Sequence, residues 1–189
     1  MPMFHLANVF AAASTLFVVI DVIGGVPTII SVKQKAGGLA ATPITLFSGF
    51  LMILFLFLGE RILHLLGVEV QSFALAGSLV LFAVALEMLL GRDIFKTDSN
   101  GGPSSSLVPI AFPILTGVGT LTTILSLNAH FNKIEVALGI ALNLIVIYFT
   151  LRLVDFIEEK LGEQTLSVIK KFFGVILLAI AIQMFKANW

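Results

Sequence analysis

One carboxylate and two clusters of helix-breaking residues are the positions of this sequence that could do chemistry. Asp21 begins residues 21–27 (DVIGGVP), which interrupt a long apolar stretch. A later apolar stretch contains Pro109, Pro113 and the run Gly117-Val118-Gly119. Proline removes a backbone donor and glycine admits unusual dihedral angles. Both stretches are therefore predicted to be broken helices.

A broken helix leaves backbone N–H groups free where its second half begins, and the helix dipole adds positive partial charge there. Such groups suit an anion such as a carboxylate. Threonine hydroxyls at the same level offer further donors. The predicted substrate-binding residues are Asp21, Gly24, Gly25, Pro27 and Thr28 in the first break, and Thr116, Gly117, Gly119, Thr120, Thr122 and Thr123 in the second. The alternative is that these small residues only let helices pack closely.

Asp21 and Glu87 are acidic residues inside apolar stretches. A carboxylate at the bilayer centre costs at least about 2.5–3.5 kcal/mol, so each needs a reason. Asp21 either binds a substrate amine, carries a proton or couples a cation, or it caps the interrupted helix, and both roles can hold together. Glu87 is a second, speculative coupling residue, and its alternative is to snorkel or to pair with Arg92.

The composition makes lipid the solvent of this chain. Of its 189 residues, 58% are hydrophobic and 12% are charged, whereas soluble domains have about 25% charged residues. Zero net charge without a basic block excludes an electrostatic nucleic-acid binder. The absence of cysteine excludes disulfides, thiolate metal sites and cysteine nucleophiles. No motif of a known catalytic type is present, so we expect no enzyme, no metal site and no cofactor.

Six apolar segments are candidate membrane spans, each of which needs about 20 residues. They cover residues 3–32, 42–58, 72–90, 107–129, 134–151 and 168–186. As one straight helix the first would reach about 45 Å, beyond a hydrocarbon core of about 30 Å. We expect an all-α protein with a single transmembrane domain, built from a three-helix repeat, a linker loop and a second three-helix repeat at residues 1–91, 92–106 and 107–189.

The two halves resemble each other in sequence. Residues 28–32 (TIISV) match residues 123–127 (TILSL) at an offset of 95, which also aligns Gly24 with Gly119. Two further matches follow in the same order. Because each half has an odd number of spans, the second must enter the membrane from the opposite side. The sequence thus predicts inverted repeats with discontinuous first and fourth helices and a substrate near the midplane.

The distribution of Lys and Arg predicts the orientation. With six spans, one side holds three of the eleven basic residues and the other side holds eight. Both termini should therefore lie outside, with three histidines in or near the outer loops: His5, His64 and His130. Three asparagines are expected to make interhelical hydrogen bonds: Asn8, Asn128 and Asn143. The acidic residues between positions 155 and 163 should form a solvated helix face.

Six segments carry a resemblance that spans nearly the whole chain: residues 21–27 (DVIGGVP), 59–63 (GERIL), 77–82 (GSLVLF), 111–119 (AFPILTGVG), 174–178 (GVILL) and 183–185 (QMF). On these residues the chain resembles the MarC family of six-span inner-membrane proteins, which includes SnatA-type neutral amino acid transporters. The family usually has proline where this chain has Val22 and Val118, and asparagine is common where it has Gly25.

The resemblance implies movement of small neutral amino acids such as glycine or alanine, and export is associated with some members. We therefore expect a secondary transporter in the cell inner membrane. Its substrate carboxylate would lie on the half-helix N-termini and its ammonium near Asp21 or backbone carbonyls. Asp21 and Glu87 are the candidate groups for proton or cation coupling. Two other classes stay open: a passive channel for small solutes, and a structural membrane subunit without a substrate.

Overall fold

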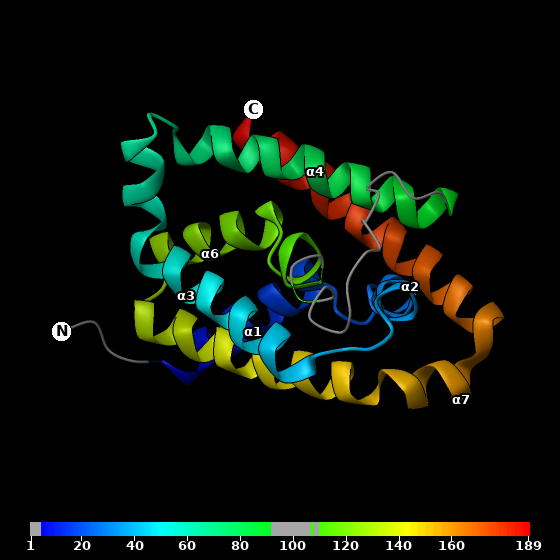
Figure 1. Cartoon of the computed structure of the whole chain (residues 1–189). Helices are drawn as coiled ribbons and strands as arrows, with labels where there is room; N and C mark the ends of the chain where they lie inside the picture. Colours follow the sequence, from blue (N-terminus) through cyan, green and yellow to red (C-terminus); the bar gives the residue numbers. More distant parts are fainter. Residues whose placement is uncertain (1–4, 92–106, 108–109) are drawn as a thin grey trace.

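The chain folds into packed helices (Figure 1). The structure is a computed structural model that describes residues 5–91, 107 and 110–189, and these residues contain no strand. The predicted linker at residues 92–106 lies outside this part. The elements are α1 (Leu6–Ile20), α2 (Val26–Ala36), α3 (Ala41–Leu65), α4 (Val70–Leu90), the π-helix η2 (Ile110–Leu115), α6 (Val118–His130) and α7 (Lys133–Asn188).

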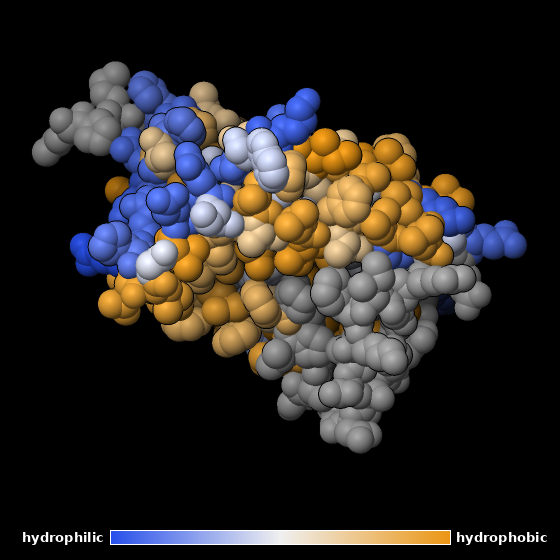
Figure 2. All heavy atoms as spheres, turned by 90° about the horizontal axis from the view of Figure 1, so that it is seen from above, coloured by the Kyte–Doolittle hydropathy of each residue, from blue (hydrophilic) through white to orange (hydrophobic). Residues whose placement is uncertain are grey.

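Four helical segments are long and apolar enough to cross a membrane: Ala41–Leu65, Val70–Leu90, Lys133–Ile157 and Ser167–Asn188. Large apolar side chains cover their outer faces, and Phe50, Phe149 and Phe172 are each more than half exposed. Figure 2 shows a hydrophobic band between two hydrophilic ends of the visible face. So large an apolar surface marks contact with lipid. The prediction of an all-helical membrane protein is confirmed.

The first apolar segment forms two helices instead of one. α1 ends at Ile20, and the next residue, Asp21, adopts a left-handed conformation with φ of 46°. A turn follows, and α2 begins at Val26 with Pro27 in its first turn, where the missing N–H leaves no helical bond unmade. The interruption predicted at residues 21–27 is present.

The second predicted interruption is also present. Phe112, within η2, has the extended angles φ −141° and ψ 127°. Gly117 then caps α6 in an extended conformation, with ψ of 170°. Helical structure therefore stops and restarts between residues 110 and 118, as the prolines and glycines of this stretch indicated. Pro109 itself lies outside the described residues.

α7 is a single chain of helical turns that reverses direction at Gly162. This residue has φ of 68° and ψ of 164°, a conformation that glycine adopts without steric cost. The reversal divides α7 into a first arm (Lys133–Ile157) and a second arm (Ser167–Asn188). The two arms correspond to the spans predicted at residues 134–151 and 168–186, and they meet at the right of Figure 1.

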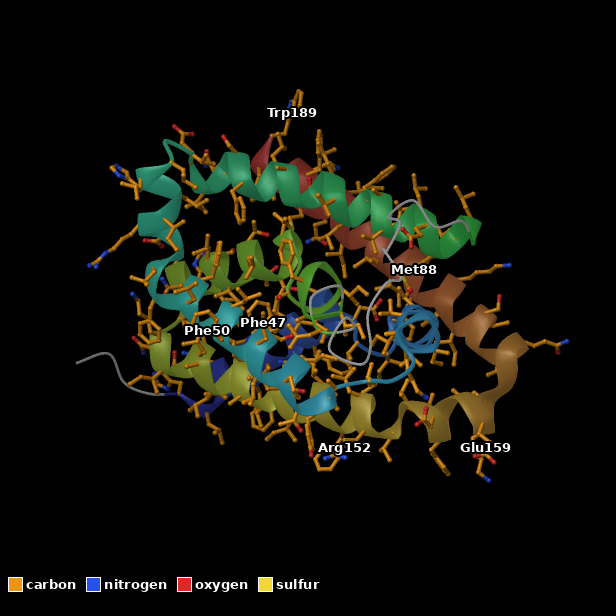
Figure 3. All side chains as sticks on the ribbon, viewed as in Figure 1. Phe47, Phe50, Met88, Arg152, Glu159 and Trp189 are labelled. Carbon is orange, nitrogen blue, oxygen red and sulfur yellow. The ribbon has the colours of Figure 1, made fainter. Side chains whose placement is uncertain are left out.

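The helices run between two ends of the bundle. At the His5 end, on the left of Figure 1, lie His5 and the turns at residues 66–69 and 131–132. At the Gly162 end, on the right, lie the C-terminal end of α4 and the reversal of α7. Arg152, midway along the lower edge of the bundle, and Glu159, near the Gly162 end, point away from the bundle (Figure 3).

The acidic stretch of α7 faces solvent where the structure describes its side chains. Asp155 has a side chain that is 70% exposed and forms an ion pair with Lys33 of α2. Glu159 is exposed as well. The prediction of a solvated helix face is confirmed for these two residues, and the side chains of Glu158 and Glu163 lie outside the description. All three histidines are exposed at helix ends, also as predicted.

The packing of α1 on the first arm of α7 uses two of the predicted asparagines. The Asn143 side-chain amide donates to the Ala13 carbonyl of α1 at 3.0 Å. The Asn8 side-chain amide donates to the Glu135 carboxylate at 3.1 and 3.2 Å. The helices approach so closely that a Cβ at Gly139 would lie 3.0 Å from the Ala13 nitrogen. Interhelical hydrogen bonds thus fix α1 on α7.

α4 packs along the second arm of α7, where Met88 lies between them (Figure 3). A Cβ at Gly174 would lie 3.1 Å from that of Met88. The neighbouring Glu87 is buried, with 8% of its surface exposed. Burial of the residue does not favour the interpretation that Glu87 snorkels. Its other predicted partner, Arg92, lies outside the described residues.

Candidate functional site

The Asp21 carboxylate is buried at the end of α1, with 8% of the residue exposed. Its Oδ1 accepts a hydrogen bond of 3.1 Å from the Gly24 N–H. Its backbone carbonyl accepts one of 2.9 Å from the Gly25 N–H. Asp21 therefore caps the interrupted backbone, which was the structural alternative for this residue. Capping uses one carboxylate oxygen, and Oδ2 accepts no hydrogen bond from the described residues.

Asp21 lines a crevice of about 80 Å³ between α1 and the second arm of α7. The other lining side chains are apolar and include Phe17, Val22 and Phe173. The crevice is narrow because Gly24 lies against the second arm, where a Cβ would come within 2.5 Å of that of Phe173. At about 30 Å³ per water, a volume of this size holds two or three waters. The site around Asp21 is thus narrow.

The N-terminus of α2 has one N–H group without an acceptor among the described residues. The Val26 N–H donates to the Ile23 carbonyl and the Ile29 N–H to the Gly25 carbonyl. Pro27 has no N–H. Within the described residues, the Thr28 N–H is the remaining first-turn donor without a backbone acceptor.

The N-terminus of α6 leaves more donors free. Its first helical hydrogen bond runs from the Leu121 N–H to the Gly117 carbonyl, at 3.1 Å. Among the described residues, the N–H groups of Val118, Gly119 and Thr120 have no acceptor. No side chain caps this helix end. Three unpaired donors and the helix dipole create a positive site inside an apolar bundle.

The threonine hydroxyls of the second break serve the backbone. The Thr116 hydroxyl donates to the Ala111 carbonyl, and the Thr120 hydroxyl donates to the Leu115 carbonyl at 3.2 Å. Those of Thr122 and Thr123 donate to the Gly119 carbonyl at 3.0 and 2.8 Å. The Ala111 carbonyl also accepts the Thr116 N–H, at 2.9 Å, so these hydroxyl protons add second bonds to backbone carbonyls in and beside the break. The free donors of this break are backbone N–H groups, and its hydroxyls can still accept.

The two breaks touch each other. A Cβ at Gly25 would lie 3.7 Å from Cγ2 of Ile114 in η2, and α1 packs against α6. Not every predicted residue converges here, because Gly119 faces Leu81 of α4. The Thr122 hydroxyl lies 3.9 Å from the Met184 sulfur, in a separate cavity. The first break and the start of the second therefore form the centre of the candidate site.

Comparison with known proteins agrees with this architecture. A family model described as MarC family integral membrane protein matches residues 6–188. The chain belongs to the MarC family. Like the UPF0056 membrane proteins MJ1677 of Methanocaldococcus jannaschii and YvbG of Bacillus subtilis, it is a MarC-type integral membrane protein.

The MarC relatives match over most of their length. MJ1677 is 27% identical over 92% of this chain and 91% of its own, and YvbG is 28% identical over 92% and 90%. The UPF0056 inner membrane protein YhgN of Escherichia coli is 27% identical over 94% of both chains. No solved structure matches the chain.

Both breaks of this MarC chain persist although valine replaces the expected prolines. Val22 is buried and lines the Asp21 crevice. Val118 is the first residue of α6 and lies against α4. A Cβ added at Gly77 of α4 would be 2.9 Å from the Val118 Cγ1. The breaks therefore do not require proline at positions 22 and 118, and in the first break it is Asp21 that takes the left-handed conformation.

Gly119 is predicted to be required for stability. A Cβ there would lie 2.7 Å from Cγ and 2.8 Å from Cδ2 of Leu81, so Gly119→Val should force α4 and α6 apart and cost about 1–3 kcal/mol. Thermal unfolding in detergent measures this loss. The matched control is Gly25→Ala, whose Cβ would meet no atom closer than 3.4 Å. An equal loss of Tm in both variants would contradict the packing explanation.

Sequence analysis missed the most completely buried carboxylate of the described residues. Glu135 is 0% exposed and accepts hydrogen bonds from the backbone N–H groups of His5 and Asn132, at 2.8 and 3.0 Å, and from Asn8. A signal was present, because Asn132 and Glu135 have the spacing of a capping box, and the structure contains one. Four hydrogen bonds from three residues to one carboxylate make this a structural anchor for α1.

Proposed function

We propose that this protein is a secondary transporter, and no enzyme, that exports small neutral amino acids such as glycine or alanine across the inner membrane. One observation carries the proposal: two interrupted helices are in contact, and the first of them holds a buried carboxylate, Asp21. First-turn N–H groups of both helices, those of Thr28, Val118, Gly119 and Thr120, lack acceptors among the described residues. A neutral amino acid is a zwitterion. Its carboxylate would bind these N–H groups and its ammonium would bind Asp21.

The proposed architecture has six spans in two inverted repeats. The four long apolar segments are continuous spans, while α1 with α2, and η2 with α6, are the two discontinuous spans. Each repeat then has three spans and begins with its broken one. Paired discontinuous helices at a repeat interface are typical of binding sites in secondary transporters.

The proposed orientation places the His5 end outside. Lys160, two residues before Gly162, and Lys33, which pairs with Asp155 of α7, are among the eight basic residues on the predicted inner side. This asymmetry agrees with the positive-inside rule. The relative YhgN is named an inner membrane protein, which supports that location.

Transport would require the breaks to open. The Asp21 crevice is narrow, at about 80 Å³, so this conformation would be constricted at the centre. Bending at residues 21–25 and 116–117, or rocking of one repeat on the other, would enlarge the crevice and expose it to alternate sides. Asp21, and less directly Glu87, are the groups through which a proton or cation could be coupled.

Counterflow in liposomes tests the function. Purified protein is reconstituted into vesicles loaded with unlabelled alanine, and uptake of external radiolabelled glycine or alanine is followed. A carrier gives saturable uptake that is stimulated by internal alanine. Uptake that neither saturates nor responds to internal alanine would identify a passive channel. Absence of both uptake and binding would favour a structural subunit.

A further inference from the structure

A polar cavity lies on the His5 side of the Asp21 crevice. Its volume is about 960 Å³, and its walls come from α1, α4, α6, the end of α3 and the second arm of α7. The polar lining includes Thr15, Glu60, Gln71, Ser126, Gln183 and Asn188. More of the lining is apolar than polar, but polar groups from five elements surround this one hollow, where water can solvate them.

The cavity carries negative charge. Glu60 is the charged residue among its described lining residues. Its side chain is exposed, and it forms no hydrogen bond or ion pair within the part of the chain that the structure describes. Low-dielectric walls focus the field of such a charge and raise the local concentration of a cation.

The cavity adjoins the Asp21 crevice. Val18 of α1 lines both spaces, and it is 44% exposed. On α7, Ile176 lines the crevice and Ile180, one turn later, lines the cavity. A solute that enters at the His5 end would thus meet Glu60 first and Asp21 second, with a short apolar constriction between them.

We infer that the polar cavity is a loading site that holds a small ammonium-bearing solute at the Glu60 carboxylate, one step before the Asp21 break. The identity of that solute as glycine or alanine rests on the proposed function. The preference for an ammonium group rests on the cavity alone. The neutral amides of Gln71 and Gln183 can bind a carboxylate on the same solute.

The absence of cysteine from the sequence permits a direct test. Ser126→Cys places one thiol in the cavity of the full-length protein. Two reagents modify this thiol: the cationic trimethylammonium-ethyl methanethiosulfonate and the anionic sulfonatoethyl methanethiosulfonate. The rate of modification by each reagent is measured and divided by its rate with free cysteine in solution. We expect the normalised cation-to-anion ratio to be about ten. Adding Glu60→Gln should lower it to about one, whereas the control Glu69→Gln, outside the cavity, should leave it at ten.

The outcomes separate the loading site from the transport proposal. A Ser126→Cys thiol as unreactive as Leu79→Cys, which faces lipid on α4 with 56% exposure, would overturn the loading site. A ratio that Glu60→Gln does not change would do the same. If added glycine or alanine slows modification of the Ser126→Cys thiol, and Glu60→Gln abolishes this protection, both proposals are supported. A charge preference without such protection supports the loading site, because the trimethylammonium probe is itself a solute of that class, and contradicts amino acid transport.

Discussion

Asp21→Asn is expected to reduce counterflow of glycine and alanine by at least tenfold without unfolding the protein. Asparagine keeps the carbonyl oxygen that accepts the Gly24 N–H and tolerates the left-handed backbone at φ 46°. The substitution therefore removes the charge and leaves the helix cap. Losing a charge-assisted contact to the substrate ammonium costs about 1.5–3 kcal/mol, a factor of ten or more in affinity.

The stability of this variant gives an independent readout. Since a buried carboxylate costs at least about 2.5–3.5 kcal/mol in a membrane, Asp21→Asn should unfold at the same temperature as the wild type or at a higher one. The matched control is Glu159→Gln, an exposed carboxylate that points away from the bundle (Figure 3). Wild-type counterflow by Asp21→Asn would remove this residue from the proposed site. A lower Tm would mean that its role is structural.

The sequence predicted the breaks well because their causes are local. Proline and glycine act on the backbone at their own positions, so the interruptions after Ile20 and before Val118 could be located without tertiary information. The reversal of α7 at Gly162 has the same kind of cause. The expectation that threonines would offer donors to a substrate depended on geometry, and there the hydroxyls of the second break turned to the backbone.

Long-range contacts could not be predicted in this way. Glu60 and Gln183 are 123 positions apart, and only the packing of α3 and α7 brings them to one cavity. The contact between Gly25 and Ile114 likewise depends on how α2 and η2 meet. Apolar periodicity does not determine which helix faces approach, because lipid and protein interior favour the same side chains.

Glu135→Gln is expected to destabilise the protein by about 3 kcal/mol and to release α1 from the first arm of α7. The glutamine NH₂ would face N–H donors where a carboxylate oxygen accepted from His5 or Asn132. A hydrogen bond to a charged group contributes about 1.5–3 kcal/mol, and a buried donor left without a partner adds a desolvation cost. Thermal unfolding measures the total loss, and hydrogen exchange of residues 8–20 measures the release of α1.

Two control variants distinguish the effect of losing the Glu135 carboxylate from a general effect of substitutions on α7. Asn8→Ala removes one donor and leaves the His5 and Asn132 bonds in place, so it should cost about 1 kcal/mol. Glu159→Gln should cost nothing measurable, since it is exposed on the same element. Equal stability of Glu135→Gln and the wild type would show that the anchor is not needed. If the anchor holds α1, the same variant should also weaken glycine binding, because Asp21 directly follows α1 and displacement of the helix moves that carboxylate away from Gly24.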